Sequence, residues 1–249
     1  MNKDYDVIII GAGPAGLKCA EQFKNTHFSV LVIEKNKVIG PKTCGGGLTS
    51  LVSSSDVPEN KTRSFQKQRT FLGDNQYIIK FVSSIKTVDR LDLGQFQLEK
   101  IGNSNNITIL KDTIVTSIRN REIITNKGVF SFKYLVGADG SSSIVRKYLG
   151  LKSKRYVGIC CDIPLITSDF IWKFNPHKMG SGYIWAFPHN THTNIGIYFN
   201  PKHLNPKIAK EILIDYLKEQ GYEFPDIKFK GGAINHLYGV ILALDLDRF

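Results

Sequence analysis

The stretch YDVIIIGAGPAGLKCAEQFKNTHFSVLVIE, residues 5–34, decides the fold class. It opens on a short apolar run, Tyr5–Ile10, and leads directly into GAGPAG at residues 11–16. A buried strand followed by the spacing Gly-x-Gly-x-x-Gly and then a helix is typical of a βαβ dinucleotide-binding unit. The sequence therefore predicts a helix from Leu17 to about residue 24 and a second strand over Ser29–Ile33.

Each glycine of the turn has its own mechanical role in such a unit. Gly11 allows the tight turn, Gly13 lets the backbone approach a pyrophosphate, and Gly16 lets helix and strand pack closely. With Ala15 they place the helix N-terminus against the phosphate charge. Glu34 ends the second strand, where its carboxylate can accept hydrogen bonds from a ribose diol and would repel a 2′-phosphate. The segment by itself does not separate FAD from NAD.

Composition points to a folded globular protein. Of 249 residues, 42% are hydrophobic and 22% are charged, which excludes disordered, collagen-like and coiled-coil chains. No apolar run approaches the ~20 residues that span a bilayer, and the N-terminus lacks the apolar region of a secretion signal. Four irregularly spaced cysteines make neither a disulfide framework nor a metal site. We expect a cytoplasmic protein.

The formal net charge of +11 leaves two interpretations open. A lysine-rich surface can simply keep the protein soluble, or it can attract the chain peripherally to an anionic membrane surface. No segment resembles a nucleic-acid-binding module, so nucleic acid is not an expected partner.

The rest of the chain alternates β segments with a few helices. Residues 36–65 read as a long loop with a short helix near 48–53. Helices are expected over residues 90–98 and 142–149 and between Asn205, which can cap a helix, and Gly221, which can end it. The expected strands are Gln76–Val82, Ile107–Leu110, Thr113–Ile118, Glu122–Thr125, Val129–Phe132, Tyr134–Ala138, Tyr156–Ile163, Phe170–Phe174, Gly182–Phe187, Thr193–Phe199 and Ile227–Gly232.

Three further segments resemble motifs of known flavoproteins. GADGSSSIVR at residues 137–146 resembles the second nucleotide fingerprint of flavoprotein hydroxylases, in which an Asp-Gly turn opens a helix near the FAD. KTCGGGL at residues 42–48 resembles the cysteine-glycine loop of geranylgeranyl reductases, and YIWAFP at residues 183–188 matches that family's Tyr-x-Trp-x-Phe-Pro motif. Together with the N-terminal turn they follow the family's order. The chain thus resembles an FAD-dependent geranylgeranyl reductase, an enzyme that saturates isoprenoid double bonds.

The resemblance implies FAD as cofactor and a polyprenyl lipid as substrate. Gly45, Gly46 and Gly47 remove every side chain from a stretch of backbone, which permits close approach of a flat ring; a flexible loop is the plainer interpretation. Cys44 beside them is the candidate catalytic proton donor, because an unactivated alkene needs one near the flavin. A small cysteine can equally well be inert packing.

The strand motif offers candidate substrate-binding residues. Tyr183, Trp185 and Phe187 fall on one face of a strand, either as sheet core or as one wall of an apolar cavity for a polyprenyl chain. His189 stands where the family often carries lysine, and a neutral imidazole is a weaker partner for an anionic head group. The other histidines, among them His192, read as surface or loop residues, and no metal site is expected.

Three more residues gain a role through the resemblance. Arg90 matches an arginine that lies against the FAD in the family, although a surface arginine is the alternative. Val115 lies in a strand whose backbone faces the adenine in relatives. Asp139 either hydrogen-bonds near the ribityl chain or caps the following helix.

The expected fold class is α/β: a Rossmann-type FAD-binding domain with an interleaved β-rich substrate domain, the hydroxylase-like architecture. The FAD-binding domain would comprise residues 1–65 and 88–150, and the substrate domain residues 66–87 and 151–231. Residues 232–249 would be an incomplete return to the FAD domain, because the Gly-Asp segment found there in relatives is absent.

The expected reaction is hydride transfer from reduced flavin to an isolated alkene of a polyprenyl lipid. An external electron donor, NAD(P)H or ferredoxin, would reduce the flavin. Two alternatives stay open: a flavin monooxygenase or halogenase, and a non-catalytic FAD-binding remnant.

Overall fold

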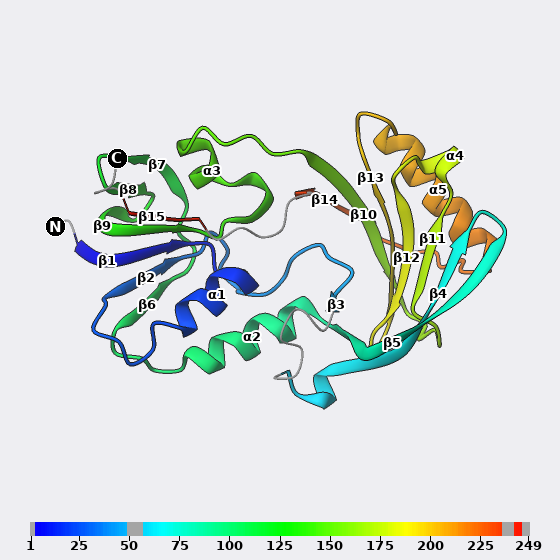
Figure 1. The fold of residues 1–249 in the computed structure, drawn as a ribbon, viewed down its shortest axis with the longest axis horizontal. Helices are drawn as coiled ribbons and strands as arrows, with labels where there is room; N and C mark the ends of the chain where they lie inside the picture. Colours follow the sequence, from blue (N-terminus) through cyan, green and yellow to red (C-terminus); the bar gives the residue numbers. More distant parts are fainter. Residues whose placement is uncertain (1–2, 49–56, 236–241, 246–249) are drawn as a thin grey trace. The chain divides into compact units, whose positions relative to one another are not determined.

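The chain folds into two compact units, each made of stretches that are far apart in the sequence (Figure 1). The computed structural model describes residues 3–48, 57–235 and 242–245. The first unit comprises Met1–Pro41, Leu91–Lys154 and Asn235–Phe249, and the second comprises Lys42–Arg90 and Arg155–Ile234. No helix within the described residues combines the length and the apolar character needed to cross a membrane.

The first unit is built on a sheet in which the described residues supply seven strands, in the order β6-β2-β1-β9-β8-β7 with β15 also paired to β9. β1 runs parallel to β2 and β9, and β2 runs parallel to β6. β8 and β15 pair antiparallel with the two halves of β9. The strands are β1 (Lys3–Ile10), β2 (Val30–Ile33), β6 (Ile107–Leu110), β7 (Val115–Arg119), β8 (Glu122–Thr125), β9 (Gly128–Gly137) and β15 (Leu242–Asp245).

Both faces of this sheet are covered, which explains the uninterrupted apolar run at its centre. Along β1, Val7 and Ile9 pack with α1 (Pro14–Glu21) and with the end of α2 (Arg90–Ile101). Ile8 and Ile10 point to the opposite face, where they pack in a cluster with β2, β9 and α3 (Ile144–Tyr148). The alternation confirms the predicted βαβ unit.

Several boundaries in the first unit differ from the sequence-based expectation. α1 ends at Glu21 rather than near residue 24, and α3 is shorter than expected because a 3-10 turn, Gly140–Ser142, precedes it. The two strands expected over residues 129–138 form one continuous β9, since β1 pairs along most of its length. β6, β8 and the hairpin turn at residues 126–128 lie where the sequence predicts them.

The second unit is built on a sheet with eight strands among the described residues, in the order β14-β10-β13-β12-β11-β4-β5-β3. Neighbouring strands run antiparallel at the pairs β10–β13, β12–β13 and β4–β5, whereas β11 runs parallel to β4. The elements are β3 (Gly47–Leu48), β4 (Thr62–Leu72), β5 (Asn75–Val88), β10 (Arg155–Ile163), β11 (Ile171–Phe174), α4 (Pro176–Met179), β12 (Tyr183–Pro188), β13 (Thr193–Phe199), α5 (Pro206–Glu219) and β14 (Lys230–Asn235).

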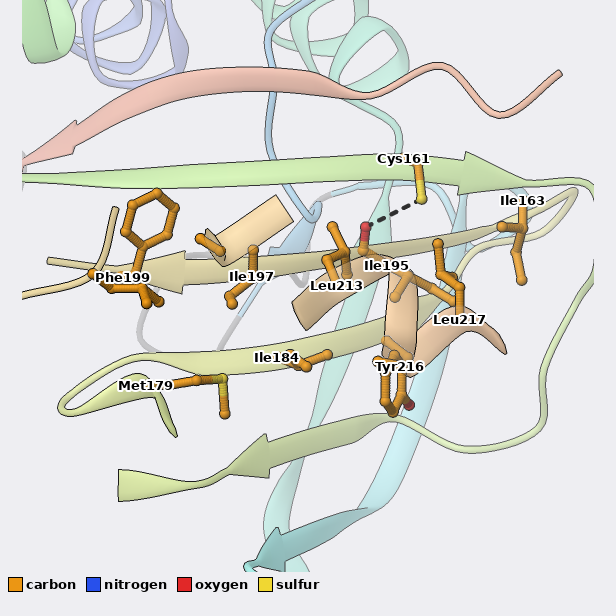
Figure 2. Close-up of a cluster of buried hydrophobic side chains, with 13 residues drawn as sticks. Cys161, Ile163, Met179, Ile184, Ile195, Ile197, Phe199, Leu213, Tyr216 and Leu217 are labelled. Atoms are coloured by element: carbon orange, nitrogen blue, oxygen red, sulfur yellow. Dashed lines mark hydrogen bonds between the residues drawn. The ribbon is translucent and has the colours of Figure 1, made fainter. Parts of the chain in front are cut away.

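α5 covers one face of the second sheet. Its buried side chains, Leu213 and Leu217 among them, pack onto Ile184, Ile195 and Ile197, as Figure 2 shows. The Cys161 thiol lies in the same cluster and donates to the Ile195 carbonyl at 3.7 Å. Cys160, its neighbour, packs into an aromatic cluster on the opposite face. The two cysteines therefore occupy opposite faces of one strand.

The division between the units differs from the expected domain boundaries. Residues 42–48 and 57–65 belong to the second unit, because β3 pairs with β5 and because β4 begins at Thr62 and pairs with β5 and β11. The sequence TRSFQKQRTFL did not predict β4, because most of the exposed positions of this strand carry polar side chains. Most of the short helix expected near 48–53 lies outside the described residues.

Candidate functional site

The glycine turn of the first unit has the geometry that a dinucleotide requires. Gly11 has a φ of +103°, and a Cβ there would collide with the carbonyl oxygen of Ala138. A Cβ at Gly16 would collide with the Gly11 carbonyl oxygen, so the third glycine lets α1 pack against the turn. At Gly13, by contrast, a Cβ would meet nothing within 4 Å. The open side of the turn is therefore at the glycine that approaches a pyrophosphate in this class of fold.

Glu34 is buried beside this turn and is held by two backbone donors. The Ala12 N–H donates to Oε2 and the Asn36 N–H donates to Oε1, each at 2.8 Å. Each carboxylate oxygen keeps a second acceptor position, because a carboxylate offers about four lone-pair sites. The turn thus fixes the orientation of the Glu34 carboxylate, and its role as acceptor for ribose hydroxyl groups stays a prediction.

The structure shows the capping role of Asp139. Its Oδ2 accepts from the Ile144 N–H at 2.6 Å and from the Val145 N–H at 3.3 Å, at the start of α3. A contact to a ribityl chain stays a prediction. Val115 begins β7, is half-buried and pairs with Thr125, so its backbone role toward an adenine also stays a prediction.

Arg90 begins α2 and carries a buried Nε that has no hydrogen-bond partner among the described residues. A buried N–H without an acceptor is costly, and native structures usually satisfy such groups. A ligand that brings an anionic or carbonyl oxygen to Arg90 would remove that cost. The orphan donor of Arg90 fits a ligand that offers an acceptor oxygen, and its role toward FAD stays a prediction.

The cysteine-glycine loop lies against aromatic side chains of the second unit. A Cβ at Gly45 would lie 2.8 Å from both Phe187 Cδ2 and Trp185 Nε1, and one at Gly47 would lie 3.3 Å from Phe187 Cε2. Gly46 has a φ of +75°, which disfavours any side chain there. Cys44 is exposed, and its Sγ accepts from the Gly46 N–H at 3.5 Å. The two segments that carry the family resemblance are therefore in direct contact.

The aromatic residues of β12 form a stacked cluster. Phe187 stacks on Phe170 with ring centroids 4.1 Å apart, and Tyr183 stacks on Trp172 at 4.8 Å. Trp185 and Phe187 are buried in a cluster on the face opposite α5, while Tyr183 packs against that cluster. The predicted common face is confirmed. The packing is that of sheet core, so a cavity wall for a lipid chain stays a prediction.

A polar network surrounds this cluster. Trp185 Nε1 donates to Asn194 Oδ1 at 2.8 Å, and Asn194 Nδ2 donates to Asp162 Oδ1 at 2.7 Å.

Tyr183 lies at the edge of the aromatic cluster. Burial raises the pKa of Tyr183, and the nearby Cys44 adds to that shift. The phenol of Tyr183 is therefore a neutral hydrogen-bonding group rather than an anion at neutral pH.

His189 is buried beneath the loop, not exposed to a head group. Its Nε2–H donates to the Gly45 carbonyl at 3.0 Å, and its ring stacks on His192 with centroids 4.6 Å apart. Nδ1 lies 3.6 Å from Asp89 Oδ1. Burial lowers the pKa of His189, which favours the neutral imidazole.

His192 does lie in a loop, as expected, but it is partly buried, and its Nε2 lies 3.7 Å from the same Asp89 oxygen. The sequence signal for this pairing is His-x-x-His across a tight turn.

The parallel sheet and the glycine turn define an α/β dinucleotide-binding fold. The pyridine nucleotide-disulphide oxidoreductase family matches residues 5–162, and the chain belongs to this family. An uncharacterized protein of Methanosarcina barkeri is 31% identical over 96% of this chain and 64% of its own length. A digeranylgeranylglycerophospholipid reductase of Methanocaldococcus jannaschii is 23% identical over 88% of this chain and 60% of its own length. The chain thus spans less than two thirds of these relatives.

Solved structures agree on the fold. A geranylgeranyl bacteriochlorophyll reductase-like protein of Thermoplasma acidophilum superposes with a TM-score of 0.81 at 19% identity, covering 94% of this chain and 67% of that one. The halogenase PltM in complex with FAD superposes with a TM-score of 0.71 at 14% identity, covering 92% and 60%. The family match and the FAD bound by a protein of the same fold agree on FAD as the cofactor, and the glycine turn fits a dinucleotide without separating FAD from NAD. Reductases and halogenases share the fold, so it does not by itself choose the reaction.

Proposed function

We propose that this chain is the FAD-binding and substrate-binding part of a reductase that saturates isolated double bonds of a polyprenyl lipid. The contact of the Cys44–Gly47 loop with Trp185 and Phe187 carries the proposal. It unites in one unit the two segments that resemble geranylgeranyl reductases. Curated relatives that bear the name digeranylgeranylglycerophospholipid reductase support the same substrate class.

The first unit would bind the nucleotide part of FAD. In this proposal the Gly11–Gly16 turn accepts the pyrophosphate and Glu34 accepts the ribose hydroxyls. Arg90, which belongs to the second unit, would donate its Nε–H to the cofactor, as the family resemblance implies. Asp139 would act through α3, whose first N–H groups it already holds. Val115 would offer backbone groups to the adenine.

The second unit would supply the proton donor and the apolar contacts that hold the substrate. FAD supplies a hydride when it is bound and reduced, and an external donor, NAD(P)H or ferredoxin, would supply its electrons. Reduction of an alkene also requires one proton on the neighbouring carbon, and we assign this proton to the exposed Cys44 thiol. Tyr183, Trp185 and Phe187 would hold the apolar chain by contact area, because it offers no hydrogen bonds. Because the substrate is a lipid, the protein would meet it at a membrane surface.

An anaerobic single-turnover experiment tests this function. Protein loaded with FAD and reduced chemically is mixed with a geranylgeranyl lipid, and products are followed by mass spectrometry. A product that gains two hydrogens per double bond supports the reductase. A hydroxylated product that forms only when oxygen is admitted would instead support the monooxygenase alternative. A halogenated product that forms only with oxygen and added halide would support the halogenase alternative. Failure to retain FAD would favour a non-catalytic remnant.

A further inference from the structure

Asp89, His189 and His192 converge in the second unit although they come from two distant segments. Asp89 lies between β5 and α2, whereas the two histidines flank the turn that joins β12 to β13. One ligand atom from each residue lies within 4.8 Å of the other two. Neither the family resemblance nor the proposed reductase function uses this convergence.

The separations fit ligands that share an ion better than they fit hydrogen bonds. Asp89 Oδ1 lies 3.6 Å from His189 Nδ1 and 3.7 Å from His192 Nε2. Hydrogen bonds between such atoms are normally about 2.7–3.2 Å long. Ligands placed about 2.0–2.1 Å from a tetrahedral zinc ion are separated from one another by roughly 3.3 Å. The three ligand atoms, which lie within 4.8 Å of one another, would have to move closer together, and the two stacked rings would have to turn toward one ion, to complete such a shell.

The outer hydrogen bonds orient both imidazoles for this task. His189 Nε2–H donates to the Gly45 carbonyl, which leaves the Nδ1 lone pair on the side of Asp89. His192 Nδ1 lies 3.2 Å from Thr191 Oγ1; in the tautomer in which Nδ1–H donates to this hydroxyl, the Nε2 lone pair faces the same carboxylate. Metal-binding histidines typically donate their second ring N–H to a carbonyl, carboxylate or water in this way. The backbone N–H of His189 donates to the backbone carbonyl of His192 at 2.7 Å. This hydrogen bond closes the turn that carries the two rings.

An ion-pair network is the competing explanation. His192 Nε2 also lies 3.5 Å from Asp162 Oδ1, so a protonated His192 between two carboxylates would account for part of the cluster. Asp162 is, however, already engaged by Asn194 and Lys230. His189 is buried, and its Nε2–H already donates to the Gly45 carbonyl, so an ion pair with Asp89 is not needed to hold its ring.

We propose that Asp89, His189 and His192 bind one divalent ion of the zinc type, with the remaining coordination position left to water or another small ligand. Two imidazoles and one carboxylate are a donor set that suits zinc and its first-row neighbours, and three protein ligands are typical of zinc sites with an open position. Through the hydrogen bond to Gly45, the ion would fix the backbone next to Cys44. The proposal does not depend on the reductase function.

Metal titration of the full, untagged chain tests the proposal. After treatment with a chelator and its removal, the protein is titrated with Zn²⁺ by calorimetry and with Co²⁺ by visible absorption. We expect one equivalent to bind per chain, visible cobalt bands from mixed nitrogen and oxygen ligands, and a zinc-dependent rise in the unfolding midpoint. The absence of stoichiometric binding would overturn the site.

Two ligand variants and one control make the assignment specific. His192→Gln and Asp89→Asn each remove a ligand at partly exposed positions, and each should weaken zinc binding at least tenfold. His203→Gln, an exposed histidine in the connection before α5, should bind zinc as the parent does. If both ligand variants fold by circular dichroism and still bind zinc with the parent's affinity, the three residues are not the site. If the parent binds no zinc and His192→Gln alters only acid stability, the ion-pair explanation replaces it.

Discussion

The glycines beside Cys44 have a packing reason that needs no cofactor. Trp185 and Phe187 occupy the space that side chains at Gly45 and Gly47 would fill, and Gly46 needs its positive φ. The same loop exposes the Cys44 thiol and ties its backbone to His189. A single stretch of three glycines thus serves the core of the second unit while the neighbouring Cys44 thiol stays exposed to solvent.

Cys44→Ala should retain FAD but lose most alkene reduction. The substitution removes the thiol at an exposed position, so folding should be unaffected, whereas the proposed proton donor is lost. Single-turnover rates of the prereduced protein on a geranylgeranyl lipid measure the effect, with the typical contribution of a general acid being about 10²–10⁴-fold. Cys19→Ala on α1 is the matched control. A rate close to the parent's in Cys44→Ala would return this cysteine to a packing role.

Glu34→Gln should weaken FAD binding. The amide keeps the size of the side chain but loses the charge that strengthens hydrogen bonds from the ribose, which typically contribute about 1.5–3 kcal/mol. With about 1.4 kcal/mol per factor of ten, affinity should fall roughly tenfold to a hundredfold. Fluorescence titration of the apoprotein with FAD measures it, and Glu21→Gln on α1 serves as control. Equal affinities in Glu34→Gln and the parent would remove Glu34 from the cofactor site.

The elements of each unit are held by a few well-defined polar contacts in addition to their apolar faces. α5 begins where the Asn205 side chain accepts from the Lys207 N–H at 2.8 Å, and Pro206 occupies its first turn. β1 is joined to β2 and β9 by Asp6, which accepts from Ser29 and from Lys133. Both features are local, so each can be tested without disturbing the candidate site.

Asn205→Ala should lower the free energy of unfolding by about 1 kcal/mol, the usual cost of losing a helix N-cap. The variant leaves one N–H at the start of α5 without its acceptor, while the apolar face on the second sheet is unchanged. Urea unfolding followed by circular dichroism measures the difference. Asn205→Asp should retain most of the parent's stability, because aspartate also caps helices. Equal losses in both variants would contradict the capping role.

Asp6 should make the first unit sensitive to acid. The hydrogen bond from Lys133 and those from Ser29 hold the pKa of Asp6 well below its usual range. Its contribution to stability is therefore present above the unfolded value of about 3.9 and is lost as the pH falls further toward the folded value. Asp6→Asn should be less stable than the parent at pH 7, and the difference should shrink below about pH 4. A difference independent of pH would contradict this account.

The chain as a whole carries a large excess of positive charge. A net charge of +11 adds a long-range attraction to anionic surfaces. This attraction would raise the local concentration of the protein at a membrane that contains its proposed substrate. It would contribute to binding but would not by itself select one lipid.

The charge predicts salt-sensitive binding to anionic vesicles. The protein should co-sediment with vesicles that contain phosphatidylserine at low ionic strength, because basic residues near such a surface contribute about 1 kcal/mol each. Binding should fall steeply toward about 1 M salt, where the Debye length is only about 3 Å. Vesicles of phosphatidylcholine alone are the control. Equal binding to both, or none to either, would contradict an electrostatic contribution.

The amino-acid sequence determined the local features whose causes lie within a few residues. The buried apolar run of β1, the turn from Gly11 to Gly16 and the cap at Asn205 follow from hydrophobic patterning, glycine conformation and hydrogen-bonding chemistry, and the structure contains each of them. The common face of Tyr183, Trp185 and Phe187 followed from strand geometry in the same way.

Only the tertiary structure decided the features that depend on distant segments. The polar sequence of β4 did not predict a strand. β4 forms because it pairs with β5 and β11, which the sequence of β4 alone does not show. The contact of the Cys44 loop with Phe187, and the convergence of Asp89 with two histidines, join segments about a hundred residues apart or more. No local pattern records such contacts, since they arise only when the sheet of the second unit places its strands side by side.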